Sequence, residues 1–169
     1  MAMKCPGCGA PMRLEAEKAC LFCDYCGTIY YPDRNADGVR ILGQASPYSC
    51  PVCATPLQQG ALDEHPLAYC ERCRGMLVEM PVFVDLIDVM RSRRAGPAAT
   101  PHAGDPRDLN RKLACPGCHR PMDTHFYAGP GNIVIDDCSR CGWNWLDYGE
   151  ITRIIAAPDR SYDEATTTF

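Results

Sequence analysis

Cysteine spacing is the feature that most restricts how this chain can fold. Twelve of its 13 cysteines form six Cys-x-x-Cys pairs. The pairs form three couples, whose members are separated by 14, 16 and 19 residues. A tight Cys-x-x-Cys turn places two sulfur atoms on one side of a tetrahedral metal ion, and a hairpin of this length brings two more to the other side. The predicted ligand sets are Cys5, Cys8, Cys23 and Cys26; Cys50, Cys53, Cys70 and Cys73; and Cys115, Cys118, Cys138 and Cys141.

We expect each set to hold one zinc ion, so the chain should bind three. Iron is the alternative metal, because sulfur tetrahedra bind it as well. The thirteenth cysteine, Cys20, creates an ambiguity, since "CLFCDYC" contains two overlapping pairs. The glycine after Cys26 and the longer hairpin favour Cys23 and Cys26 as ligands. Cys20 is then expected to be a small apolar residue on the hairpin, although a replacement ligand or a redox-sensitive thiol stays open.

Disulfide bonds are the main competing use of so many cysteines. The opening residues, "MAMKCPGCGA", lack the apolar stretch of a secretory signal peptide. The most apolar run, residues 76–90, contains three carboxylates and is too short to span a bilayer. Thiols stay reduced in the cytosol, where regular cysteine pairs bind metal. We therefore expect a cytoplasmic protein with no membrane contact.

The expected fold class is a small, metal-stapled protein of three tandem zinc ribbons, the second and third each followed by a short α-helix. With 15 prolines and 14 glycines, the chain is poorly suited to one large core. The metals are therefore expected to supply most of the folding free energy. The predicted segments are ribbon 1 (1–31), a connector (32–48), ribbon 2 with its helix (49–94), a flexible linker (95–112), ribbon 3 with its helix (113–157) and a loose tail (158–169).

Two segments carry helix patterns. Residues 80–93, "MPVFVDLIDVMRSR", are amphipathic, with Pro81 tolerated in the first turn and arginines suited to the C-terminal end. In ribbon 3, Asp147 and Glu150 are three residues apart ahead of "ITRIIAA", the spacing of a capping box. Both ribbons should therefore end in a helix.

The third ribbon resembles a known family. "CPGCHRPM…CSRCGWNWLDYGEI" is similar to the zinc-ribbon family named after transcription factor IIB, strongly over residues 115–155. The resemblance implies zinc binding, a core built around Trp145, and a helix begun by Asp147 and Glu150. Trp143 departs from the pattern, because the family usually has a small residue there. The positions that carry the match are Cys138, Cys141, Gly142, Trp145, Leu146, Asp147 and Glu150.

The other two ribbons resemble known patterns less closely. Residues 50–92 look like a weaker copy of the same family, with Leu77, Val78 and Glu79 in place of Trp-Leu-Asp. Pro81 and Val82 replace the Gly-Glu that follows, so the helix-cap pair should be lost. Residues 4–31 resemble a generic short bacterial zinc ribbon. These resemblances imply a metal site but no specific activity.

No pattern in the sequence indicates catalysis. A catalytic zinc needs an open coordination position, and a complete four-cysteine site has none. The thioredoxin motif is also Cys-x-x-Cys, but it requires a βαβ setting that is lacking here. Histidine ligation is not expected, because each site already has four cysteines. We therefore predict a protein that is not an enzyme and has no small-molecule substrate, with a redox-sensing zinc chaperone as a less favoured alternative.

Two classes of partner remain. The leading hypothesis is a protein-protein adaptor or scaffold, using residues 80–93 and the aromatic step at Trp143, Trp145 and Tyr148 together with Arg91, Arg93 and Arg94. The alternative is a nucleic-acid-associated or transcription-related factor. Zinc thiolates would take the net charge from −4 to roughly −10, which opposes binding to phosphates. The basic residues available to the alternative are Arg91, Arg93, Arg94, Arg111, Lys112 and Arg120.

Overall fold

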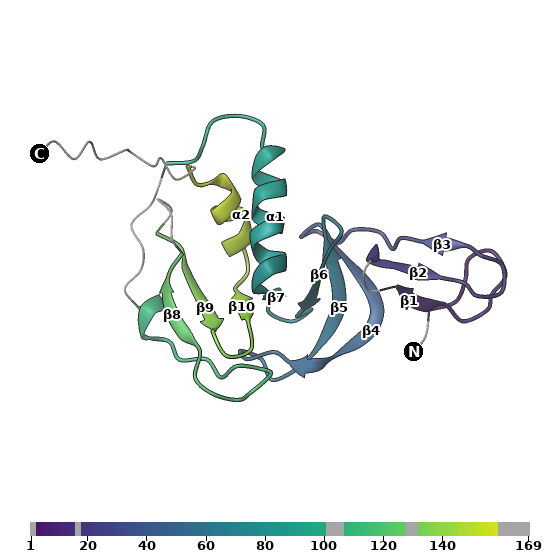
Figure 1. Ribbon diagram of the computed structural model, residues 1–169, viewed down its shortest axis with the longest axis horizontal. Helices are drawn as coiled ribbons and strands as arrows, with labels where there is room; N and C mark the ends of the chain where they lie inside the picture. Colours follow the sequence, from purple (N-terminus) through teal and green to yellow (C-terminus); the bar gives the residue numbers. More distant parts are fainter. Residues whose placement is uncertain (1–2, 16–17, 101–106, 128–131, 159–169) are drawn as a thin grey trace, which may run out of the picture.

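A computed structural model describes residues 3–15, 18–100, 107–127 and 132–158. Strands β1 (Arg13–Glu15), β2 (Cys20–Phe22) and β3 (Ile29–Tyr30) form a small antiparallel sheet in ribbon 1. The remaining strands form one seven-stranded antiparallel sheet in the order β4-β5-β6-β7-β10-β9-β8. Figure 1 shows the ribbon 1 sheet at one end of the molecule, beyond β4. The elements of the larger sheet are β4 (Val39–Ser49), β5 (Pro56–Leu62), β6 (His65–Tyr69), β7 (Met76–Glu79), β8 (Asp123–Phe126), β9 (Val134–Cys138) and β10 (Trp143–Leu146).

Ribbons 2 and 3 are joined through their third strands. β7 pairs antiparallel with β10, with Leu77 opposite Trp145, Met76 opposite Leu146 and Val78 opposite Asn144. Leu77 and Trp145 each follow the last cysteine of their ribbon by four residues. Equivalent residues therefore meet around a local two-fold axis, as in the self-complementary interface of a symmetric dimer.

The two faces of this sheet have different cores. On one face, Met76 and Val78 from β7 and Leu146 from β10 pack against the helices α1 (Met80–Ser92) and α2 (Glu150–Ala156). On the other face, Leu77 and Trp145 pack with ligand cysteines of ribbons 2 and 3. This division follows from the alternation of side chains along a strand. The two ribbons thus share a hydrophobic core, instead of each folding around its metal alone as the sequence predicted.

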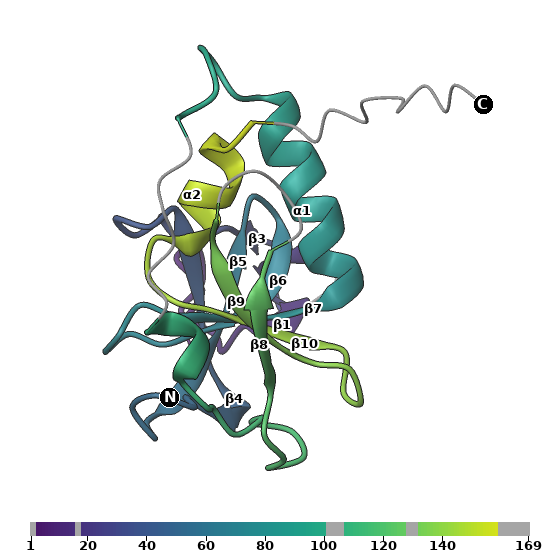
Figure 2. The same cartoon turned by 90° about the vertical axis from the view of Figure 1, so that its left-hand side faces the viewer.

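The helices lie side by side over the sheet (Figures 1 and 2). Arg91 of α1 donates to the carbonyl oxygen of Ile154 at 2.8 Å, and Arg94 donates to those of Ile155 and Ala157, both at 2.8 Å. These carbonyls end α2 and lack partners within that helix. The arginines lie at the C-terminal end of α1, as expected, and their guanidinium groups bind the C-terminus of the neighbouring helix.

The helix starts agree in part with the sequence analysis. The Glu150 carboxylate accepts a hydrogen bond from the backbone N–H of Asp147 at 2.8 Å, which is one half of a capping box. The other half does not form, because Gly149 is the residue before α2 and the Asp147 side chain instead accepts from the Trp145 indole. At α1, Glu79 makes no side-chain cap, consistent with the predicted loss of the cap pair.

The expected connector and linker contain more structure than predicted. The segment 32–48 was assigned as a connector on its turn residues, but most of it belongs to β4, which pairs with β5 despite two register shifts. In the segment 95–112, the described ends are held by a bond from the Ala99 N–H to the Ala156 carbonyl and by a 3-10 helix, η2 (Asp108–Asn110). The tail beyond residue 158 lies outside the described residues.

Gly75 makes the contact between the two ribbons possible. A Cβ at Gly75 would lie 2.3 Å from Cζ2 of Trp145, so only glycine admits the indole ring. The equivalent residue in ribbon 3 is Trp143, and the equivalent of Trp145 is Leu77. The Trp145 side chain of ribbon 3 thus lies over a residue of ribbon 2 that has no side chain.

Substitution of Gly75 by alanine should destabilise the shared core. We expect a loss of about 2–3 kcal/mol in the free energy of unfolding, because the added methyl group overpacks the indole. Urea denaturation of the zinc-loaded protein measures it. The control is the same substitution in a Trp145→Phe background, where the ring is smaller and the additional cost should fall. An equal cost in both backgrounds would contradict the proposed contact.

Glu150 should make stability depend on pH. Burial raises its pKa to about 7 from 4.5. A carboxyl group whose pKa is raised on folding contributes stability below its unfolded pKa, and that contribution is lost as the pH rises through the folded pKa. Between pH 6 and 8 this loss should amount to about 1 kcal/mol. Glu150→Gln keeps the acceptor for Asp147 but cannot titrate, so urea denaturation should show the loss in the native protein and not in the variant.

Candidate metal centres

All six cysteine pairs adopt the same backbone turn. In each pair, the N–H four residues after the first cysteine donates to the carbonyl oxygen of that cysteine, at 2.8–2.9 Å. The donor residue has a positive φ in every case, between 57° and 76°. Backbone N–H groups also point at sulfur, as from Gly7 to Cys5 at 3.3 Å and from Gly117 to Cys115 at 3.4 Å. The turn therefore orients the two sulfur atoms of each pair toward the same site. The six donor residues are Gly9, Gly27, Ala54, Arg74, His119 and Gly142.

The sulfur atoms of each predicted set lie within 4.8 Å of one another. Contacts across the sites measure 3.6 Å between Cys5 and Cys26, 3.6 Å between Cys50 and Cys73, and 3.7 Å for Cys118 and Cys138. A tetrahedron with zinc–sulfur bonds of about 2.3 Å has edges of about 3.8 Å, whereas a disulfide brings its sulfurs to about 2 Å. Each group could therefore hold a zinc ion, and the cofactor prediction is confirmed.

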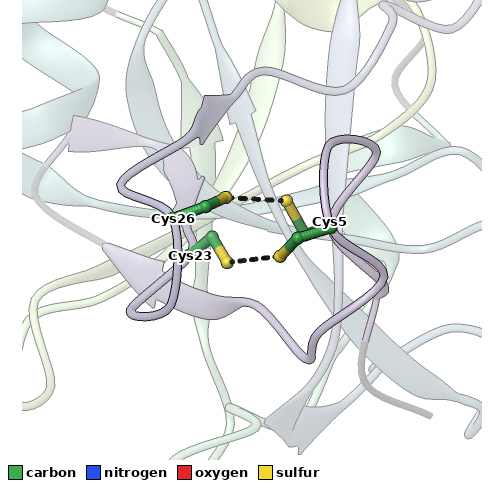
Figure 3. A group of neighbouring side chains, drawn as sticks. Cys5, Cys23 and Cys26 are labelled. Carbon is green, nitrogen blue, oxygen red and sulfur yellow. Dashed lines mark hydrogen bonds between the residues drawn. The ribbon is translucent and has the colours of Figure 1, made fainter.

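Figure 3 shows the sulfurs of the first site converging between two turns. Cys23 and Cys26 complete this site, while Cys20 lies buried in β2 outside the ligand group. Of the four ligands, Cys8 and Cys26 are exposed. The second and third sites contain no exposed ligand and lie against the core of Leu77 and Trp145. The first site is thus the most open to solvent.

Each site contains a cysteine whose pKa is lowered, and the first site contains two, because hydrogen bonds to the Cys5 sulfur outweigh the effect of burial and lower its pKa too. The hydroxyl and backbone N–H of Thr28 lower the pKa of Cys26 to about 6. The backbone N–H of Arg120 lowers the pKa of Cys118 to about 7. Burial raises the pKa of Cys70, but hydrogen bonds to its sulfur outweigh burial and leave a pKa of about 7. Each site therefore presents one sulfur near neutrality as a thiolate, which is the form that binds metal.

The structure separates the residues expected at a partner surface. Trp145 is fully buried, and its indole donates to Asp147 at 3.1 Å. Trp143 is half-buried and packs edge to face with Tyr48, with ring centroids 5.1 Å apart. Tyr148 is 57 % exposed on another side, where the Arg74 guanidinium stacks 4.0 Å from the centre of its ring. The aromatic step predicted from the sequence is therefore not one surface.

Most of the predicted basic residues are engaged within the protein. Arg91 and Arg94 bind the end of α2, as described above. Arg93 forms an ion pair with Asp63 at 2.5 Å. Arg111 binds Asp136 at 2.6 Å and Asp147 at 2.5 Å. The other two residues, Lys112 and Arg120, are exposed.

One polar cluster was not predicted from the sequence. Asp37 accepts a hydrogen bond from the Tyr69 hydroxyl at 2.6 Å and pairs with Arg74. The Arg74 guanidinium and the Tyr69 hydroxyl lower the pKa of Asp37. The cluster joins the segment before β4 to ribbon 2, and through Tyr148 to ribbon 3. Its members are far apart in sequence and carry no shared motif, so only the fold brings them together.

Comparison with known families agrees with this geometry. A family described as "Transcription factor zinc-finger", of the transcription-factor-IIB zinc-ribbon type, matches residues 49–88 and 114–157. The match confirms the resemblance to this family predicted for ribbons 2 and 3, whereas the resemblance of residues 4–31 to a generic short zinc ribbon stays a prediction. No curated protein and no solved structure matched the chain. Among the described residues, no helix is long and apolar enough to cross a membrane.

The first metal should be the easiest to remove. A chelator should take one of three ions first, because only the first site has exposed ligands. Since ribbons 2 and 3 share their own core, the indole N–H signal of Trp145 should persist after this first loss. The measurement is metal release followed together with 15N NMR spectra. A Cys5→Ser, Cys8→Ser variant should lack the fast phase, and early loss of the Trp145 signal would contradict the assignment.

Substitutions at the positive-φ residues of the cysteine turns test how much the left-handed backbone conformation costs a residue other than glycine. Nothing lies within 4 Å of a Cβ added at Gly27 or Gly142, so alanine there tests conformation alone. We expect Gly142→Ala to cost about 1 kcal/mol. The reverse change, Ala54→Gly, should stay within about 0.5 kcal/mol of the native protein, because relief of the positive φ offsets the entropy of glycine. Urea denaturation with saturating zinc compares them, and equal destabilisation by both changes would refute the argument.

Proposed function

We propose that this protein is a non-enzymatic zinc-binding adaptor whose ribbons bind other proteins. The observation that carries the proposal is the use of Arg91, Arg94 and Arg111 inside the fold, where they join helices and strands. These three arginines are half of the six basic residues that a nucleic-acid interface would need. The net charge of −4 also disfavours a phosphate-binding surface.

The absence of catalysis is part of the same proposal. Each metal group offers four cysteine sulfurs, which fill the coordination sphere of a tetrahedral ion. A zinc ion held in this way has no position left for water or substrate. The metals then act by fixing the turns that build the surface of the protein.

The second candidate is a transcription-related factor. It is favoured by the description of the family to which ribbons 2 and 3 belong. Such a role is compatible with the adaptor proposal if the contact is made to a protein of the transcription apparatus. A direct nucleic-acid contact would depend on Lys112 and Arg120, the two exposed members of the basic set.

Affinity capture from the native lysate, with and without nuclease, distinguishes the two. The adaptor proposal expects a discrete protein that remains bound after nuclease treatment. A Lys112→Ser, Arg120→Ser variant should capture it equally well, because neither side chain belongs to the fold contacts described above and serine keeps the backbone N–H of residue 120. Capture that disappears with nuclease, and falls in this variant, would favour the nucleic-acid alternative. Variants of Arg91, Arg94 or Arg111 are unsuitable, since their loss would disturb the fold.

A further inference from the structure

A groove runs along one side of α1. It consists of two adjoining cavities of about 570 Å³ and 210 Å³, which share Pro66 and Val82. The larger cavity follows α1 toward Arg93, and the smaller one reaches Trp143 and strand β4. We call these two cavities together the α1 groove. None of the zinc ligands lines it.

The smaller end of the α1 groove offers an apolar anchor site. The edge-to-face pair of Tyr48 and Trp143 lies beside Pro47, Leu67 and Val82. Trp143 is only half-buried, so part of its indole remains available. Half-buried aromatic rings with a polar edge are the groups that most often anchor protein partners. This end should therefore accept one aliphatic or aromatic side chain.

The rim of the α1 groove carries negative charge. Glu64 and Glu79 are exposed at its two ends, and neither has an ion-pair partner among the described residues. Asp85 is also exposed and pairs with His65 at 2.8 Å. On the positive side, Arg93 and Arg34 both pair with Asp63, and Lys18 is the other cation. The carboxylates of Glu64, Glu79 and Asp85 outnumber Lys18 and the one arginine charge that Asp63 leaves, so the rim of the groove has a small excess of negative charge.

The turn between β5 and β6 holds one of these acids in an unfavourable conformation. Asp63 and Glu64 have φ values of 47° and 71°, a region where glycine or asparagine is preferred in two-residue hairpins. Glutamate at this position costs stability, yet it places a carboxylate at the rim of the groove. Strain of this kind is found where function requires a particular side chain.

We propose that the α1 groove binds a basic peptide segment of a partner protein. An apolar side chain of the segment would enter the site beside Tyr48 and Trp143. Lysine or arginine residues on either side of it would meet Glu79 and Glu64. The inference rests on the proposed adaptor function and names the surface and the chemistry of its partner.

Selection from a phage-displayed library of random twelve-residue peptides, on the zinc-loaded full chain, provides the test. Enriched peptides should be net basic and contain an aliphatic or aromatic residue. The chain has two tryptophans, so two indole N–H signals report on binding. A synthetic selected peptide should shift the signal of Trp143 and leave that of buried Trp145 in place. No enrichment, acidic peptides, or an unchanged Trp143 signal would each overturn the proposal.

Charge variants locate the site. Glu79→Lys and Glu64→Lys should each weaken peptide binding about tenfold, as expected for reversing a charge at an interface. Asp123→Lys makes the same charge change on β8, away from the groove, and should bind as the native protein does. Glu64→Gly should raise the stability of the turn and still weaken binding. Binding that is unaffected by both lysine variants would overturn the proposal.

The two proposals can fail separately. If a partner captured in the nuclease experiment binds the Glu64→Lys, Glu79→Lys double variant as well as the native chain, the α1 groove is not its site and the adaptor function stands. If the native chain captures only nucleic acid, the adaptor function itself fails.

Discussion

Antiparallel hydrogen bonding between β7 and β10 places Leu77 opposite Trp145, and this register determines where both zinc ribbons and both helices lie. One residue of slippage would turn the ligand-facing side chains toward the helices and the helix-facing ones toward the metals. The indole of Trp145 over Gly75 opposes such slippage, because a Cβ at Gly75 would lie 2.3 Å from the ring and the neighbouring residues, Arg74 and Met76, both have a Cβ. Arg91 and Arg94 of α1 then reach the end of α2, which lies beside α1 on the same face of the sheet.

The three ribbons consequently depend on metal to different degrees. Among the described residues of ribbon 1, the hydrophobic cluster consists of Cys5, Met12, Leu21 and Cys23, of which two are ligands. A core this small cannot fold a chain segment by apolar burial alone. Ribbons 2 and 3 bury a much larger set of apolar side chains between the sheet and the helices, and this set contains no metal ligand. In these ribbons the zinc ions fix the turns, while packing holds the halves together.

The ligand sets could be predicted from the sequence because metal geometry restricts the number of residues between ligand cysteines. That number can be counted directly in the sequence. The helix over 80–93 could be predicted from its apolar periodicity for a similar reason. The pairing of β7 with β10 could not, because it joins residues 68 positions apart and no turn fixes it. The need for glycine at position 75 could not be predicted either, because it arises from contact with the ring of Trp145. Likewise, Arg91 and Arg94 suited the end of their own helix by sequence, but in the fold they reach the end of α2.

The linker between ribbons 2 and 3 converts what would be a two-chain interface into an intramolecular one. Tethering of this kind gives the halves an effective concentration on the order of millimolar, so even a weak mutual affinity keeps them together. Tethering also allows the two sides of the axis to carry different residues, which is impossible for two identical chains. In a homodimer every residue near the axis occurs twice, and two indoles would compete for the same space. Because both copies here belong to one chain, ribbon 3 could keep Trp145 while ribbon 2 diverged to Leu77, and ribbon 2 could keep the small Gly75 while ribbon 3 acquired Trp143.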